Sequence, residues 1–192
     1  QAKLGEGIQT LACTALRTDT PATATHCRHP RDAMSLTLLA PPAEEPVALA
    51  DLKAFLKIDG SDEDTVLSTL LRAARGHLEA LTARGFVTQT WRITRDAWPA
   101  HGRMTLPIGP AASLDAVTVT GAAGPVSVSP ALFRLDGAGT PPRLAWAPGS
   151  LPAPAVAMAG IALEVTVGWG EAADVPPTLV QAVRLLAAHW FE

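Results

Sequence analysis

The sequence contains no tyrosine and no asparagine, and only two of its 192 residues are cysteine. Without asparagine, the chain carries no acceptor for N-glycosylation. The two cysteines, Cys13 and Cys27, are too few for the disulfide framework of a small secreted domain. A reducing compartment such as the cytoplasm is therefore expected.

Charged residues are also scarce, at 17% of the chain, and the net charge is −3. A protein that binds nucleic acid through its phosphates would be strongly basic, so that class of function is not expected. Hydrophobic residues make up 48% of the chain, which excludes disorder over its whole length. No membrane partner is expected, because the longest apolar stretch, Ala153–Leu163, contains Pro154 and Gly160 and is shorter than the roughly 20 residues of a spanning helix.

The length fits one domain preceded by an arm. Residues 1–46 show no sustained hydrophobic period, so we expect an extended N-terminal arm that a partner orders. Residues 47–192 carry the periodicity of regular structure. Three helices are predicted there, at about 49–58, 62–83 and 176–190, with a β-rich region at about 87–170 between the second and the third.

The second predicted helix has the strongest pattern. Ser61 is the expected N-cap, negative charges in the first turn suit the positive end of the helix dipole, and Gly85 is expected to end the helix in a left-handed conformation. Asp174 is the expected cap of the third helix. The apolar stripe of the second helix comprises Val66, Leu67, Leu70, Leu71, Ala74, Leu78 and Leu81.

Between the helices, short alternating segments separated by turn residues predict seven strands. The clearest is Ile161–Trp169, in which Ile161, Leu163, Val165 and Val167 share one face. An antiparallel sheet or a small sandwich is the expected arrangement, and the class is α+β. The other segments are Thr88–Arg95, Arg103–Leu106, Ala116–Thr120, Val126–Ser129, Leu132–Leu135 and Arg143–Trp146.

Two groups of possible metal ligands have unsuitable spacing. In the arm, the two cysteines are too far apart for the usual zinc pair, and His26 is adjacent to Cys27, which makes a poor chelate. The acidic stretch around Asp59 lacks the glycine and the bidentate glutamate of a calcium loop. We therefore expect no metal and no other cofactor. The full sets considered are Cys13, His26, Cys27 and His29 for zinc, and Asp59, Ser61, Glu63 and Asp64 for calcium.

No catalytic constellation is apparent either. His77, His101 and His189 fall on separate predicted elements, and the sequence has no Gly-x-Ser-x-Gly elbow. Gly168-Trp169-Gly170 and Gly137-Ala138-Gly139 do not directly precede a helix, so they are interpreted as turns and not as phosphate loops. An enzyme or ligand-binding domain remains one alternative, and it would require a pocket with converging polar groups.

Trp169, Trp190 and Phe191 are the candidate interface residues. Large aromatic side chains are enriched at the centres of interfaces. Core packing is the favoured interpretation for the two tryptophans, and interface anchoring is the alternative. Phe191 follows Trp190 directly and is expected to point to another side of its helix.

A series of motifs, in order along residues 48–192, resembles the phage head–tail connector (adaptor) proteins, which also occur in gene transfer agents. No single motif is specific, but the series is. It comprises Leu52-Lys53-Ala54-Phe55-Leu56-Lys57-Ile58-Asp59 with Asp62-Glu63-Asp64, Leu78-Glu79-Ala80-Leu81-Thr82, Gln89-Thr90-Trp91, Leu106-Pro107, Leu114 with Val117, Val165-Thr166-Val167-Gly168-Trp169-Gly170, Val175-Pro176-Pro177, Gln181-Ala182-Val183 and His189-Trp190-Phe191-Glu192.

The resemblance implies a structural virion protein without enzymatic activity, assembled in the bacterial cytoplasm and located at the head–tail junction of a phage-like particle. Its implied fold is a helical bundle of two N-terminal helices and one C-terminal helix, with an inserted antiparallel β-rich region. Adaptors form a homo-oligomeric ring, by family analogy a dodecamer, beneath the portal protein. The implied partners are therefore the portal, other copies of the chain, and head-closure or tail proteins.

In this family double-stranded DNA passes through the lumen of the ring. A negative lumen would let DNA slide, because basic side chains would hold its phosphates. Asp62, Glu63, Asp64 and Asp136 are the candidate channel-facing acids. The other alternative is a head-closure or tail-completion protein of the same kind of particle, which would bind the tail side and not the portal.

Overall fold

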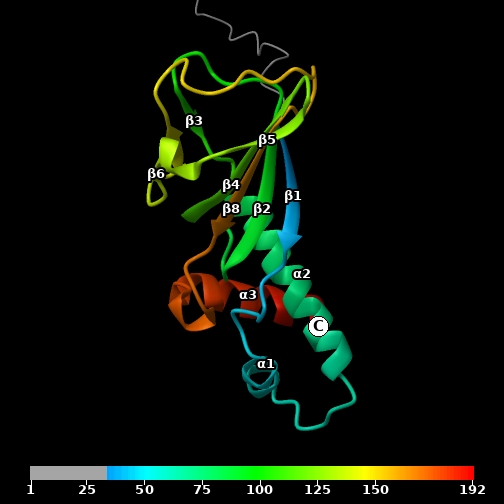
Figure 1. Ribbon diagram of the computed structural model, residues 1–192. Coiled ribbons are helices and arrows are strands. Elements are labelled where there is room, and N and C mark those ends of the chain that lie inside the picture. Colours follow the sequence, from blue (N-terminus) through cyan, green and yellow to red (C-terminus); the bar gives the residue numbers. More distant parts are fainter. Residues whose placement is uncertain (1–33) are drawn as a thin grey trace, which may run out of the picture.

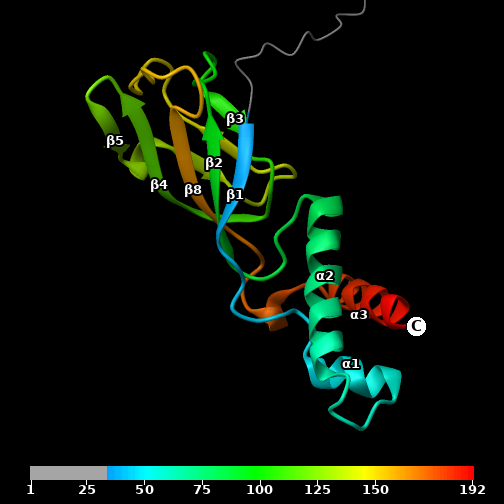
Figure 2. The same ribbon diagram turned by 90° about the vertical axis from the view of Figure 1, so that its right-hand side faces the viewer.

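The computed structural model describes residues 34–192, which form two lobes (Figures 1 and 2). Eight strands make up the β lobe and three α-helices make up the helical lobe. The strands are β1 (Met34–Ala40), β2 (Gln89–Arg95), β3 (Arg103–Thr105), β4 (Ala111–Gly121), β5 (Gly124–Val128), β6 (Arg134–Asp136), β7 (Arg143–Ala145) and β8 (Ile161–Val167). The helices are α1 (Leu49–Leu56), α2 (Asp64–Thr82) and α3 (Pro177–Phe191), with short 3-10 turns at Pro130–Leu132 and Ala172–Asp174.

The strands form two antiparallel sheets. The larger sheet has the order β1-β2-β8-β4-β5, and the smaller has the order β3-β7-β6. The strands β2 to β8 lie between α2 and α3 in the sequence, as expected. The predicted α+β class, with three helices and antiparallel sheets, is confirmed.

The core of the β lobe lies between the two sheets. The predicted face of β8 is confirmed, because Ile161, Leu163, Val165 and Val167 are all fully buried there. Alternation of this kind places every second side chain of a strand on the same face. The small sheet covers this face with Met104, Leu144 and Trp146, and Trp98 and Phe133 pack their rings against Trp146.

The helical lobe has a core of its own. In Figure 2, α2 runs from α1 up to the β lobe, and α3 crosses it. The stripe predicted on α2 was wrong at Val66 and Leu81, which are exposed, and its other residues are buried or partly buried. The buried side chains of the helices have helical spacing. They are Leu52 from α1, Leu67, Leu71 and Ala74 from α2, and Val183, Ala187 and Ala188 from α3, joined by Val47, Phe86, Val87 and Val175 from the connections between the lobes.

Part of the predicted arm belongs to the fold. Residues 34–46 were expected in the arm, whereas Met34–Ala40 forms β1 and pairs with β2 from Met34↔Arg95 to Ala40↔Thr90. The strand gives no burial pattern, because all seven of its residues are exposed. The sequence of this edge strand therefore shows only a brief alternation of polar and apolar residues, which is too short to predict a strand. Residues 1–33 of the expected arm lie outside the described part of the chain.

Three predicted helix signals were wrong in detail. Helix α2 begins after Glu63 and not after Ser61, and the left-handed residue at its end is Ala83 (φ 52°) and not Gly85. Helix α3 is preceded by Pro176, whereas Asp174 belongs to a capping box with Glu171 in the preceding 3-10 turn. The helix boundaries nevertheless lie within two residues of the predicted ones.

Replacement of Leu67 by alanine tests the core of the helical lobe. Leu67 is fully buried in α2, and removal of its side chain leaves a cavity, so the free energy of unfolding should fall by about 3 kcal/mol. Leu81→Ala is the matched control on the same helix, because Leu81 is 69% exposed and its loss should change stability by about 0.5 kcal/mol or less. Urea unfolding followed by tryptophan fluorescence measures both values, and equal effects would contradict the assignment of the core.

Candidate functional site

The chain crosses between the two lobes three times, and we call these crossings the junction: residues 41–48, 83–88 and 168–176. Backbone hydrogen bonds tie the crossings together. Trp169 N–H donates to Phe86 O at 3.0 Å, and Thr88 N–H donates to Gly170 O at 2.9 Å. Residues 168–170 were interpreted as a turn and not as a phosphate loop, and here they form a connection that runs from β8 toward α3.

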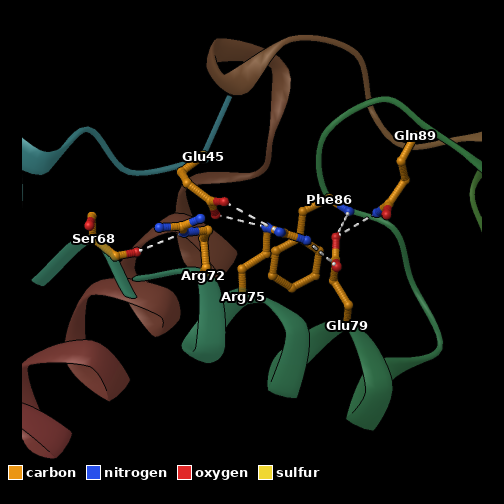
Figure 3. Close-up of polar contacts among 7 residues, drawn as sticks. All are labelled: Glu45, Ser68, Arg72, Arg75, Glu79, Phe86 and Gln89. Carbon is orange, nitrogen blue, oxygen red and sulfur yellow. Dashed lines mark hydrogen bonds and ion pairs between the residues drawn. The ribbon is translucent and has the colours of Figure 1, made fainter. Parts of the chain in front are cut away.

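Glu79 of α2 binds the crossing at residues 83–88 and the start of β2 (Figure 3). One carboxylate oxygen accepts hydrogen bonds from Phe86 N at 2.8 Å and Gln89 Nε2 at 2.7 Å. The other accepts from Arg75 Nη1 at 2.7 Å, one helical turn earlier. Glu79 is only 8% exposed, so these partners supply the hydrogen bonds that water would otherwise supply.

Arg75 extends the network to the crossing that precedes α1. Its Nε donates to Glu45 Oε2 at 2.7 Å, so Glu45, in the crossing before α1, is held against α2 (Figure 3). Burial alone would lower the pKa of Arg75, but the hydrogen bond to Glu45 and the charges of Glu79 and Glu45 outweigh burial and raise it above its ordinary value. The guanidinium is therefore a permanent cation between two carboxylates.

Two glycines allow the crossings to approach each other closely. A Cβ on Gly85 would lie 2.8 Å from Gln89 Nε2 and 2.8 Å from a methyl group of Val167. Gly168 has a φ of +125°, and a Cβ there would lie 2.7 Å from the backbone of Val87. Gly85 was predicted as a left-handed cap, but its role in the structure is this close approach.

The candidate interface aromatics differ in exposure. Trp169 is half-buried in the junction, 6.2 Å from the Phe86 ring and 5.7 Å below the Arg84 guanidinium. Phe191 packs partly against the core of the helical lobe. Trp190 is 40% exposed at the end of α3, and its ring lies edge-on to His77 of α2 at 5.7 Å. Trp190 is therefore the most accessible of the three.

The candidate channel acids lie at two separate places. Asp62, Glu63 and Asp64 lie at the start of α2, where Asp64 pairs with Lys53 Nζ at 2.6 Å. Asp136 lies in β6 of the other lobe (Figure 1), and it accepts a hydrogen bond from Arg143 Nε at 3.0 Å. The structure of one chain therefore does not bring the four carboxylates together.

The other candidate residues do not converge on a catalytic or metal site within residues 34–192. His77 lies on α2, His101 lies before β3, and His189 lies on α3. Among the described residues, no three His, Cys, Asp or Glu side chains are placed to hold a metal ion. The residues considered for zinc in the arm lie outside this range. None of the described helices is long and apolar enough to span a membrane.

The sequence analysis missed the network around Glu79. The pair Arg75–Glu79 has the i,i+4 spacing of a helix salt bridge, but such pairs are common on exposed helix faces. The informative signal is the position of Glu79 directly after Leu78, at the border of the apolar stripe. A carboxylate at such a border is buried only where the following chain folds back over it.

Among the solved structures similar to this chain are three chains from gene transfer agent (GTA) particles. A chain in the neck of an empty GTA particle, computed with C6 symmetry, shares 29% identity over 82% of this chain and 83% of its own, with a TM-score of 0.72. A chain in the virion of the native particle has 29% identity, coverage of 81% and 83%, and a TM-score of 0.70. The neck of the native particle, computed with C12 symmetry, gives 29% identity, coverage of 82% and 82%, and a TM-score of 0.67.

No protein-family model matches the chain, and no curated protein does. The structural matches cover both lobes, because 82% of 192 residues cannot come from one lobe alone. The resemblance to head–tail connector proteins is confirmed. The chain, two lobes joined at a polar junction, is thus similar to chains found in the virion and in the neck of GTA particles.

Replacement of Glu79 by glutamine tests whether the junction holds the connector-like fold together. The amide cannot neutralise Arg75 and would turn an N–H toward a neighbouring donor, so the free energy of unfolding should fall by about 3 kcal/mol. Glu164→Gln is the matched control, because Glu164 pairs with Arg92 on the exposed face of the sheet and should cost less than about 1 kcal/mol. Similar urea midpoints for the two variants would contradict the role given to Glu79.

Asp136 should titrate below its ordinary pKa of 3.8. The hydrogen bond from Arg143 is the main cause; desolvation opposes it, and the nearby positive charges add to it. Since the folded pKa is depressed, any stability contributed by this carboxylate is present above the unfolded pKa and is lost as pH falls through the folded pKa. NMR titration of the carboxyl carbon measures this value, and Arg143→Gln should raise it. An unchanged pKa in that variant would contradict the assigned cause.

Proposed function

We propose that the chain is the structural subunit of a head–tail connector: an adaptor ring beneath the portal that joins the capsid vertex to the tail. The observation that carries the proposal is the match to a chain of the GTA neck over 82% of this chain and 83% of that one, with a TM-score of 0.72. A match of this extent supports a common fold for the two chains. The chain would accordingly reside at the neck of a phage-like particle.

The symmetry of the similar structures supports ring formation by this chain. The necks to which the chain is similar were computed with C6 and with C12 symmetry. A closed ring of one kind of subunit needs two different complementary surfaces on each copy. A rigid subunit serves such a ring well, because small differences in the angle between lobes would accumulate around the circle. The ion pairs at the junction supply this rigidity.

Trp190 and Phe191 are proposed to contact the portal or a neighbouring copy. They end α3, and Trp190 is 40% exposed there with its ring against His77 of α2. Trp169 is proposed to support this surface from within the junction, because its ring is already held by Phe86 and Arg84.

The acidic residues at the start of α2 and in β6 are proposed to face the lumen. Asp62 and Glu63 are exposed, and Asp136, whose pKa is lowered from an already acidic ordinary value by the hydrogen bond from Arg143, is ionised near neutral pH. Double-stranded DNA would then pass without specific contacts, since negative side chains repel its phosphates. Asp62 and Asp136 belong to opposite lobes, so they would line the lumen at two different heights.

Native mass spectrometry of the chain mixed with the portal protein of the same gene cluster tests the connector role. The expected product is a complex in which the number of copies of this chain is equal to, or a simple fraction of, the number of portal subunits. A complex with a tail-side protein instead would support the alternative, a head-closure or tail-completion protein. Binding to neither would contradict the proposal.

Two variants on α3 refine this measurement. Trp190→Ala should weaken the portal complex about ten-fold, because truncation of a central aromatic residue typically costs more than 1 kcal/mol. Leu185→Ala is the control: Leu185 is 51% exposed on the same helix and has no aromatic contact. An unchanged complex with Trp190→Ala would remove Trp190 from the portal surface, while the ring itself would stand.

A further inference from the structure

The edge of the large sheet at β1 is unprotected. Strand β1 is the terminal strand of this sheet, and its seven residues, MSLTLLA, include no charge and no proline. Proteins usually guard such edges, because the unpaired N–H and C=O groups invite another chain to pair with them. The opposite edge, β5, carries Pro125, which cannot donate a hydrogen bond. On β1, only the irregularity between Leu38 and Ala40 interrupts the edge.

At β1, the hydrophobic face of the large sheet is also partly exposed to solvent. Leu36 lies opposite Ile93, and Leu38 lies opposite Trp91, so both leucines are on the face that forms the core of the β lobe. Yet Leu36 is 37% exposed and Leu38 is 41% exposed. They form one wall of a groove of about 540 Å³, whose other wall is the part of α2 around Gly76 and Ala80.

Two residues that line this groove, Gln89 and Trp91, each have one buried side-chain atom without a hydrogen-bond partner within residues 34–192: Gln89 Oε1 and Trp91 Nε1. The residue Gln89 is only 2% exposed, and its Nε2 is fixed on Glu79, so Oε1 is left as an acceptor. Trp91 Nε1 is a donor. A buried polar atom without a partner is costly, so the side chains that line this groove are not fully satisfied by contacts within residues 34–192.

We propose that a segment of a second copy of this chain covers the β1 edge and fills the groove, as the contact between neighbours in the ring. This inference rests on the proposed ring. A second copy is favoured over an unrelated partner because the similar necks have C6 and C12 symmetry, so each subunit of such a ring lies between two copies of itself. The uncharged edge also fits a partner with an apolar segment, and 48% of the residues in the chain are hydrophobic.

Photo-cross-linking in assembled particles tests this contact. Benzoylphenylalanine is placed at Leu36 or at Leu38 of the full chain, in cells that make the particle, and purified particles are irradiated. We expect a product with the mass of two chains, in which position 36 or 38 is joined to a peptide of this same protein. Thr118, on the opposite face of the same sheet, is the control position, where this product should be at least about five-fold weaker.

The possible results of this experiment test the proposed contact at β1 and the proposed connector role separately. If the chain is absent from purified particles, the connector role fails. If the chain is present but positions 36 and 38 join it to a different protein, the connector role stands and the inference is overturned. Equal dimer yields at Leu38 and Thr118 would overturn it as well, because proximity in the ring alone would then explain the product.

Hydrogen–deuterium exchange on unmodified protein gives a second readout if the substituted chains do not enter particles. In assembled particles, the amides of Met34–Ala40 should exchange at least about ten-fold more slowly than in the free chain, because they would be paired or covered. Equal exchange in the two states would overturn the inference.

Discussion

The carboxylate of Glu79 is the contact on which the arrangement of the two lobes depends. It is nearly buried, and it accepts hydrogen bonds from the chain that leaves α2 and from Gln89 at the start of β2. Arg75 balances its charge and also holds Glu45. The cost of placing a carboxylate away from water is thus offset only when all three segments are in place. This condition couples the helical lobe to the β lobe.

The regular elements could be predicted from the sequence because their signals are local. The stripe containing Leu67 and Leu71 on α2, and the alternation from Ile161 to Val167 on β8, each reflect one face turned to a core. Strand β1 could not be found in this way, since all its residues are exposed and its pairing with β2 joins positions about 60 residues apart. The helix ends were misassigned at Ser61, because no side-chain cap forms at the start of α2 and the helix begins after Glu63. At Gly85 the absence of a side chain serves the close approach of the crossings, and Ala83 takes the left-handed conformation instead.

The candidate site was harder to predict than the fold. Aromatic residues such as Trp190 can be recognised in a sequence as possible anchors, but their exposure depends on how α3 packs against α2. The network around Glu79 requires knowledge of which segments cross, and the open groove beside β1 requires knowledge of which strand lies at the edge. The interfaces of a ring subunit are formed by residues that are far apart in the sequence, so no short motif marks them. A resemblance over the whole chain is therefore more informative about function than any single residue.

A structure of the neck of the particle that contains this chain, determined by electron cryo-microscopy, tests the central claim most directly. The account requires a ring of this chain between portal and tail, with each copy keeping the Glu79–Arg75–Glu45 network and with the β1 edge covered by the next copy. A neck in which the chain is absent, or a ring in which the two lobes have separated at the junction, would contradict it.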